Sequence, residues 1–146
     1  MTHSKHEQFF LSSSFAVIGN SKRKPFPMLT YGGLRSMGKT VYAVDLGGAV
    51  AVNGDAAFRS LSAIPKGVDA AVIEVPRNQT LDAVKQVADA GIKRVWLHQR
   101  TETPEALAFC RERGIDAHHG SCAVMYTGAG SYHRVHRVLA KLLRTY

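Results

Sequence analysis

A short turn rich in basic residues carries the clearest chemical signal in the sequence. Residues 19–25 read Gly-Asn-Ser-Lys-Arg-Lys-Pro and directly follow the apolar run 15–18. We expect a helix to begin near Phe26. Backbone N–H groups are unpaired at a helix N-terminus and the helix dipole is positive there, so a strand that ends in such a turn suits a phosphate group. The residues predicted to contact that phosphate are Gly19, Asn20, Ser21, Lys22 and Arg23.

The turn matches neither of two widespread phosphate-binding motifs. The dinucleotide fingerprint G-x-G-x-x-G would need glycines where Ser21 and Lys24 stand. The Gly-Lys-Thr at residues 38–40 precedes a predicted strand, whereas the same residues in a P-loop precede a helix. The turn therefore predicts a phosphate-bearing ligand and leaves its identity open.

Asp45 is a second candidate, at the end of the next apolar run. Dinucleotide enzymes hold a ribose hydroxyl with an acidic residue at this place, which would indicate NAD(P). An aspartate that caps the turn before Gly47 fits the position equally well. Both interpretations stay open.

Two further groups of residues could do chemistry, but their patterns are incomplete. His98 follows a predicted strand, and no carboxylate or nucleophile is paired with it in the sequence. His118, His119 and Cys122 lie close together but lack the second Cys or His pair of a zinc site. We therefore predict no catalytic residue and no metal ligand, and we expect Cys122 to touch a ligand or to pack beneath it.

The elements that position these residues alternate between strand and helix along the whole chain. Apolar runs predict five strands, at residues 15–19, 40–45, 69–75, 94–98 and 115–118. Helices are expected from Phe26, briefly at 56–61, from a cap at Asn78 to Gly91, from Thr103 to Gly114, and from Ser131. Residues 49–53 are open to forming a short extra extended piece, which the turn predicted by Asn53-Gly54 would close.

This alternation predicts an α/β fold, a single Rossmann-like, doubly wound, five-stranded parallel sheet flanked by helices. Ligands of such sheets bind outside the carboxyl ends of the strands. We expect residues 1–14 to be an N-terminal arm, able to form a short helix over the sheet, and residues 15–146 to be the nucleotide-binding domain.

Composition limits the classes of partner. The formal net charge of +8 favours an anionic partner, but the charges form no single run and do not alternate with aromatic residues, so nucleic acid is not expected. The apolar run 9–11 is too short for a membrane span or a signal peptide, and two cysteines exclude a disulfide framework. We expect a cytoplasmic protein that binds a small molecule; a homodimer stays open.

Several short motifs follow one another in the order seen in small stand-alone CoA-binding domain proteins, so the chain resembles this family. These proteins are similar to the N-terminal CoA-binding domain of the succinyl-CoA synthetase α-subunit. The similarity covers residues 15–126. The motifs are Phe-Ala-Val-Ile-Gly-Asn-Ser at 15–21, Gly-Lys-Thr-Val-Tyr-Ala-Val at 38–44, Ser-Leu at 60–61, Ile-Pro at 64–65, Val-Asp at 68–69, Val-Pro at 75–76, Val-Trp-Leu at 95–97, Gly-Ile at 114–115, and Cys122.

The resemblance implies that residues 19–22 face phosphate groups, that Val75 and Pro76 line an adenine, and that Gln99 and Cys122 lie toward the pantetheine. In the synthetase the active-site histidine belongs to a second domain, and the resemblance of this chain extends only to the CoA-binding domain, so we expect no ligase activity. The expected function is thus non-catalytic binding of CoA or an acyl-CoA. The alternative is an NAD(P)-binding redox sensor or oxidoreductase, with Asp45 on the ribose and Cys122 or His98 near the nicotinamide.

Overall fold

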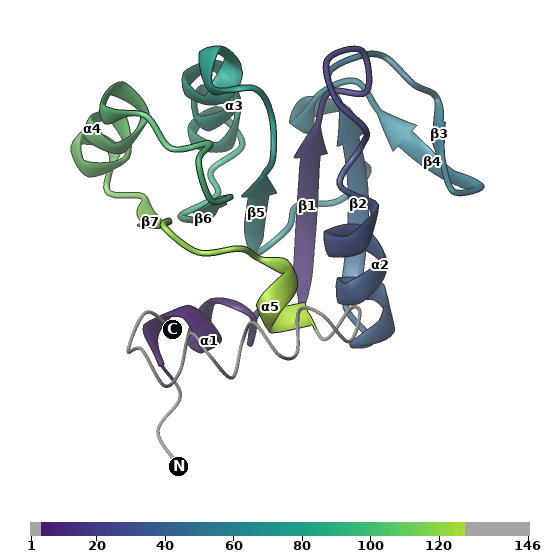
Figure 1. Cartoon of the computed structure of the whole chain (residues 1–146), viewed down its shortest axis with the longest axis horizontal. Helices are drawn as coiled ribbons and strands as arrows, with labels where there is room; N and C mark the ends of the chain where they lie inside the picture. Colours follow the sequence, from purple (N-terminus) through teal and green to yellow (C-terminus); the bar gives the residue numbers. More distant parts are fainter. Residues whose placement is uncertain (1–3, 128–146) are drawn as a thin grey trace.

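A computed structural model of the protein describes residues 4–127, which form a mostly parallel sheet with helices packed against it (Figure 1). The strands are β1 Ser14–Gly19, β2 Thr40–Asp45, β3 Ala51–Val52, β4 Asp55–Phe58, β5 Ala70–Ile73, β6 Arg94–Leu97 and β7 Asp116–His118. The helices are α1 Lys5–Phe9, α2 Met28–Ser36, α3 Arg77–Asp89, α4 Pro104–Arg113 and α5 Val124–Thr127, with a short 3-10 turn at Leu61–Ala63.

The order across the sheet is β3-β4-β2-β1-β5-β6-β7. All neighbours are parallel except β3, which is antiparallel to β4. Numbered along the chain, the six parallel strands lie in the order 3-2-1-4-5-6 of the Rossmann fold. The sheet therefore reverses its direction of growth between β1 and β5, and their carboxyl ends flank the crevice where such folds bind ligands.

The core lies on both faces of the sheet, as the continuous apolar strands predict. Side chains of a strand alternate between faces, so Phe15 and Val17 pack with α1, α2 and α5, while Ala16 and Ile18 pack with α3 and α4. All four are fully buried. This double covering confirms the doubly wound α/β class.

The five predicted strands are all present, and the sheet has two more, of which β3 lies within the extended piece expected at residues 49–53. Residues 55–58 form β4, so the brief helix expected at 56–61 was wrong. Asn53 and Gly54 have φ values of 50° and 81°, and successive residues of positive φ make the tight turn that joins β3 to β4 as a hairpin. Ala57 of β4 then pairs with Ala43 of β2. Pairing with an existing sheet edge prevailed over the weak local preference of two alanines for a helix.

Two predicted helix starts are displaced. The helix expected near Phe26 begins at Met28, because a residue before proline is disfavoured in the helical conformation and Phe26 precedes Pro27. Asn78 was predicted as a helix cap, which was wrong: α3 already begins at Arg77, and Pro76 occupies the cap position. Thr103 does cap α4, accepting a hydrogen bond from Ala106 N at 3.2 Å.

The N-terminal arm folds as the short helix α1, which Ser4 and Glu7 begin with a reciprocal capping box. Phe9 and Phe10 of this segment are 0% and 3% exposed and pack on Trp96. The arm therefore contributes to the core. The division between an arm at residues 1–14 and a domain at residues 15–146 stays a prediction. The helix expected from Ser131 lies outside the described residues.

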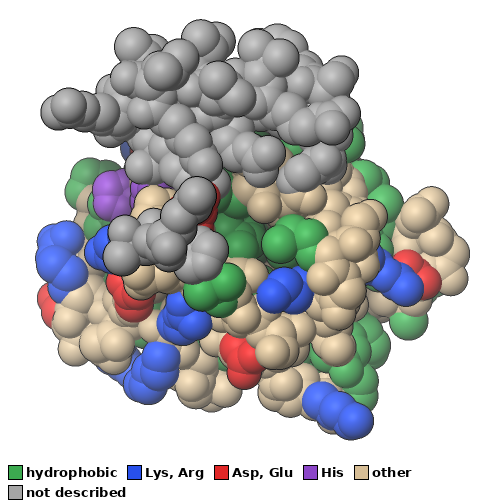
Figure 2. Space-filling view, turned by 90° about the horizontal axis from the view of Figure 1, so that it is seen from below, with side chains coloured by type: hydrophobic (Ala, Val, Ile, Leu, Met, Phe, Trp, Pro, Cys, Tyr) green, Lys and Arg blue, Asp and Glu red, His purple; other side chains and the backbone are tan. Residues whose placement is uncertain are grey.

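Charge is dispersed over the face seen from below, where single blue cations and red carboxylates are interspersed among neutral and apolar side chains (Figure 2). Within residues 4–127, no helix combines the length and the apolar character needed to cross a membrane.

Candidate functional site

The carboxylate of Asp45 organises the basic turn. Its Oδ1 accepts hydrogen bonds from Ser21 N at 2.8 Å and Gly47 N at 3.0 Å. Its Oδ2 accepts from Ser21 Oγ at 2.5 Å and Ala49 N at 3.1 Å. The side chain is fully buried at the C-terminal end of β2. Asp45 thus ties the turn after β1 to the turn after β2, as the turn-capping interpretation expects, and both of its oxygens already have two donors.

The ionisation of Asp45 follows from these bonds. Burial alone would raise the pKa of the carboxyl, but the hydrogen bonds from Ser21, Gly47 and Ala49 favour the charged form and lower the pKa below its usual value. The buried carboxylate is therefore an anion that the protein itself neutralises.

Asn20 connects the same turn to α3. Its Nδ2 donates to Gln79 Oε1 at 2.8 Å, and its Oδ1 accepts from Lys22 N at 3.1 Å. The N–H groups of Arg23 and Lys24 donate to the Asn20 carbonyl. The turn is consequently rigid, and the N–H groups of residues 21–24 are all paired. The unpaired N–H groups expected beside it lie instead at the start of α2, where Pro27 offers no side-chain cap.

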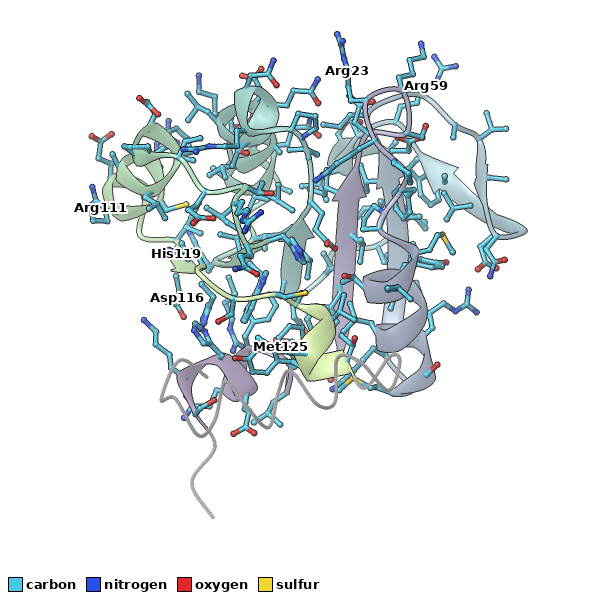
Figure 3. The ribbon with its side chains drawn as sticks, viewed as in Figure 1. Arg23, Arg59, Arg111, Asp116, His119 and Met125 are labelled. Atoms are coloured by element: carbon cyan, nitrogen blue, oxygen red, sulfur yellow. The ribbon has the colours of Figure 1, made fainter. Side chains whose placement is uncertain are left out.

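Three cations project outward from this rigid frame. Lys22, Arg23 and Lys24 are exposed. Arg59, at the C-terminal end of β4, projects from the same edge of the sheet as Arg23 (Figure 3). Sequence reasoning missed Arg59 because it placed a helix at residues 56–61. Recognition of Asn53-Gly54 as a hairpin turn would have predicted a strand after it, and with it the position of Arg59 at the end of that strand.

The predicted adenine and pantetheine residues occupy the neighbouring strand ends. Val75 is buried and Pro76 half-buried after β5, and Gln99 is exposed after β6. Gln99 lies in a turn closed by the hydrogen bond from Thr101 N to the His98 carbonyl, 2.8 Å, in which Arg100 has a φ of 69°. The fold thus brings all ten predicted residues to loops and strand ends around one edge. Their contacts with a ligand stay a prediction.

A second cluster was not foreseen: Glu74, His98 and Cys122 meet beside the start of α2. Nδ1 of His98 lies 2.8 Å from Oε1 of Glu74, and His98 and Cys122 line the same cavity. Burial alone would lower the pKa of His98, but its electrostatic interactions with Cys122 and Glu74 outweigh burial and raise the pKa to about 9. His98 is therefore an imidazolium at neutral pH.

This cluster lines a cavity of about 350 Å³. Residues 26–30 form one wall, and Val124 closes another side. Three buried polar atoms of lining residues have no hydrogen bond within residues 4–127: Oγ1 of Thr30, Oε2 of Glu74 and Nδ1 of His98. The contact between Nδ1 of His98 and Oε1 of Glu74 is thus an ion pair at short distance and lacks hydrogen-bond geometry. Cys122 is 9% exposed and packs in the core before α5, so its surroundings are less polar than a surface turn.

The histidines near Cys122 lie in different surroundings. His118 is buried, stacks on Trp96 with ring centroids 5.9 Å apart, and lies 3.0 Å from Asp116. His119 is exposed near Asp116 (Figure 3). Among the described residues, no group of three His, Cys, Asp or Glu side chains could hold a metal ion.

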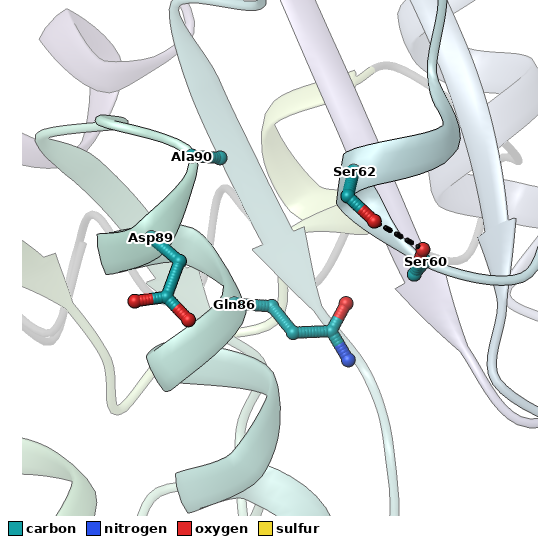
Figure 4. A pocket seen from close by; sticks show the side chains of 5 residues that line it. All are labelled: Ser60, Ser62, Gln86, Asp89 and Ala90. Carbon is teal, nitrogen blue, oxygen red and sulfur yellow. Dashed lines mark hydrogen bonds between the residues drawn. The ribbon is translucent and has the colours of Figure 1, made fainter.

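A separate cavity of about 370 Å³ lies between the 3-10 turn and the C-terminal half of α3 (Figure 4). Ser60 and Ser62 form one wall and hydrogen-bond to each other at 2.8 Å, and Gln86 and Asp89 form the opposite wall. None of the predicted site residues lines this cavity, and its lining includes a carboxylate but no cation. It does not share the chemistry of the basic edge.

Comparison with solved structures places the fold among small proteins of the same size. A conserved hypothetical protein from Pyrococcus furiosus is 28% identical over 76% of this chain and 96% of its own, with a TM-score of 0.67. A hypothetical protein from Pyrococcus horikoshii OT3 is 22% identical over 86% and 89%, with a TM-score of 0.73, which shows the shared fold.

A larger protein contains the same fold as one part. The dinucleotide forming acetyl-coenzyme A synthetase 1 of Ca. Korarchaeum cryptofilum, solved with phosphate and ADP, is 26% identical over 72% of this chain and 25% of its own, with a TM-score of 0.60. A comparison with curated proteins found no match. The family model described as the CoA binding domain matches residues 13–127. This chain therefore belongs to the CoA-binding domain family.

Proposed function

We propose that the protein binds coenzyme A, free or acylated, across the carboxyl edge of β1, β2, β4, β5 and β6. The observation that carries the proposal is the preorganised turn at residues 19–25. Asp45 and Asn20 hold its backbone, so exposed Lys22 and Arg23 can meet a pyrophosphate without first ordering the loop. Binding to a preordered site avoids the entropic cost of ordering it.

The charges of this edge suit a polyanion. Asp45 is neutralised within the protein by four hydrogen bonds, and Glu74 is paired with His98. The exposed cations therefore dominate the field that a ligand meets. The uncapped start of α2 adds a positive helix end directly after the basic turn.

Arg59 suits the phosphate on the ribose of coenzyme A. In Rossmann-type sites the ribose lies beside the end of the second strand, and a nearby arginine accommodates an additional ribose phosphate. Here β4 is the neighbour of β2, and Nε of Arg59 lies 4.0 Å from the position that a Cβ would take on Gly48. A ribose hydroxyl would have to compete for Asp45 with the four protein donors, which favours coenzyme A over NAD(P).

Titration calorimetry with coenzyme A, dephospho-coenzyme A and NAD tests the proposal. Lys22→Gln should weaken coenzyme A binding about tenfold, the loss expected for one charge-assisted hydrogen bond. The matched control Lys66→Gln alters an exposed lysine that precedes β5, at the opposite edge of the sheet, and should leave the affinity unchanged.

Arg59→Gln should weaken the binding of coenzyme A and leave the binding of dephospho-coenzyme A unchanged. Binding of NAD without binding of coenzyme A would refute the proposal. An unchanged preference for coenzyme A over dephospho-coenzyme A in Arg59→Gln would refute only the assignment of Arg59.

A further inference from the structure

We propose that Cys122 is a nucleophile that accepts the acyl group of a bound acyl thioester, with His98 as its acid–base partner and Glu74 as the positioning residue. This inference rests on the proposed binding of acylated coenzyme A and goes beyond the non-catalytic role expected from the sequence.

The three side chains have the arrangement of a nucleophile, a base and an orienting carboxylate. His98 lines one cavity together with Cys122 and Glu74, and its Nδ1 lies 2.8 Å from Oε1 of Glu74. In nucleophilic enzymes the base must lie within hydrogen-bond reach of the nucleophile, and a third group orients the base. Each residue comes from a different strand end, after β5, β6 and β7, so the fold itself assembles them.

The surroundings of the cluster favour reaction of a thioester over simple burial of a thiol. Cys122, His98 and Glu74 line a cavity of about 350 Å³, so the sulfur is reachable from this hollow although little of the residue is exposed. Glu74 is 6% exposed, and its Oε2 has no hydrogen-bond partner among residues 4–127. An unsatisfied polar atom in a buried position is costly, and a ligand or water that enters the cavity would satisfy it.

The cavity is also placed for the reactive end of the proposed ligand. The chain runs from the basic turn at 19–25 directly into residues 26–30, which form the cavity wall. A ligand anchored by its phosphates at the turn can extend its pantetheine arm along this segment. The start of α2 then offers N–H groups without a side-chain cap to the carbonyl oxygen of the thioester, where negative charge develops.

The step conserves atoms and needs no oxidant. In the reactive form the thiol proton resides on His98, so that a Cys122 thiolate faces the His98 imidazolium. The thiolate attacks the thioester carbonyl carbon and forms a new C–S bond. The C–S bond to coenzyme A breaks, and the departing coenzyme A sulfur takes the proton from the imidazolium. The products are S-acyl-Cys122 and free coenzyme A, so one thioester replaces another.

The test is the intact mass of the full chain after incubation with acetyl-coenzyme A and a phosphine reductant, which prevents disulfides. We expect the mass to rise by one acetyl group, which peptide mapping assigns to Cys122 and neutral hydroxylamine removes, as it does from thioesters but not from amides. Cys122→Ser should stay unmodified at this site. The matched control Cys110→Ala alters a cysteine buried in the core of the opposite face and should react like the original protein.

Two further variants separate chemistry from folding. His98→Gln should slow acylation by about 100-fold or more, the contribution of a general acid–base group. Glu74→Gln should slow it and displace the pH profile of the rate toward lower pH, which a purely structural carboxylate would not do. Calorimetric binding of coenzyme A by each variant shows that the site is intact.

The outcomes distinguish the two proposals. Binding of acetyl-coenzyme A without acylation of the original protein between pH 7 and 9, or acylation of Cys110 or lysine alone, overturns the role of Cys122 and leaves the binding function standing. Failure to bind coenzyme A overturns both. Peptide mapping of the unsubstituted chain decides the matter even if a variant fails to fold.

Discussion

Replacement of Asp45 by asparagine tests whether one buried carboxylate organises the basic edge. The amide oxygen can keep the two bonds of Oδ1, from Ser21 N and Gly47 N. The amide NH₂ then faces the N–H of Ala49, which loses its acceptor. An orphaned donor costs about 1–3 kcal/mol, and exchanging charged for neutral acceptors costs roughly 1 kcal/mol more, so we expect Asp45→Asn to lower the free energy of unfolding by about 3 kcal/mol.

Urea denaturation at pH 7, followed by the fluorescence of Trp96, measures this loss, because Trp96 is the sole tryptophan and is fully buried. The melting temperature should fall by about 10 °C. The matched control Asp82→Asn changes an exposed aspartate of α3 and should stay within about 0.5 kcal/mol of the original protein. A similarly small change for Asp45→Asn would refute the proposed organising role.

The pH dependence of the stability difference between the original protein and Asp45→Asn provides a second check. The folded pKa of Asp45 is lowered, so its stabilisation is fully present above the ordinary carboxyl pKa near 3.8 and is lost as the pH falls through the folded value. The difference between the original protein and Asp45→Asn should therefore be constant from pH 6 to 8 and shrink below about pH 4. A difference that grows in acid would contradict this assignment.

Two other predictions use the same denaturation assay. The pKa of His98 is raised from 6.5 to about 9, which corresponds to a stabilisation on the order of 3 kcal/mol. This stabilisation is complete below pH 6.5 and is lost as the pH rises through 9, so the stability of His98→Gln should approach that of the original protein by pH 10. A difference in stability that stays constant with pH would contradict the pairing of His98 with Glu74. Gly33→Ala would place a Cβ 2.5 Å from Thr127 Oγ1 and should destabilise the α2–α5 contact by about 1–3 kcal/mol. Gly32→Ala, with no atom within 4 Å of its Cβ, should instead stabilise α2 by about 0.5–1 kcal/mol, and equal effects of the two alanines would contradict the packing.

Local sequence patterns decided most of the secondary structure of this protein. Apolar runs, which bury side chains on both faces of a parallel sheet, predicted β1, β2, β5, β6 and β7. Thr103-Pro104 and Gly114 marked the ends of α4, because a capping hydroxyl and a left-handed glycine act within one turn of chain. The basic turn after β1 was visible for the same reason.

The tertiary structure decided which side chains act together. β4 forms because β2 offers it an unpaired edge, and Arg59 reaches the basic edge only through that pairing. Whether Asp45 caps a turn or faces a ligand depended on the approach of Ser21, which is 24 residues away in the chain. Glu74, His98 and Cys122 have no sequence spacing that identifies them. They meet because parallel strands in register end at one edge of a sheet, a consequence of long-range packing that no local pattern encodes.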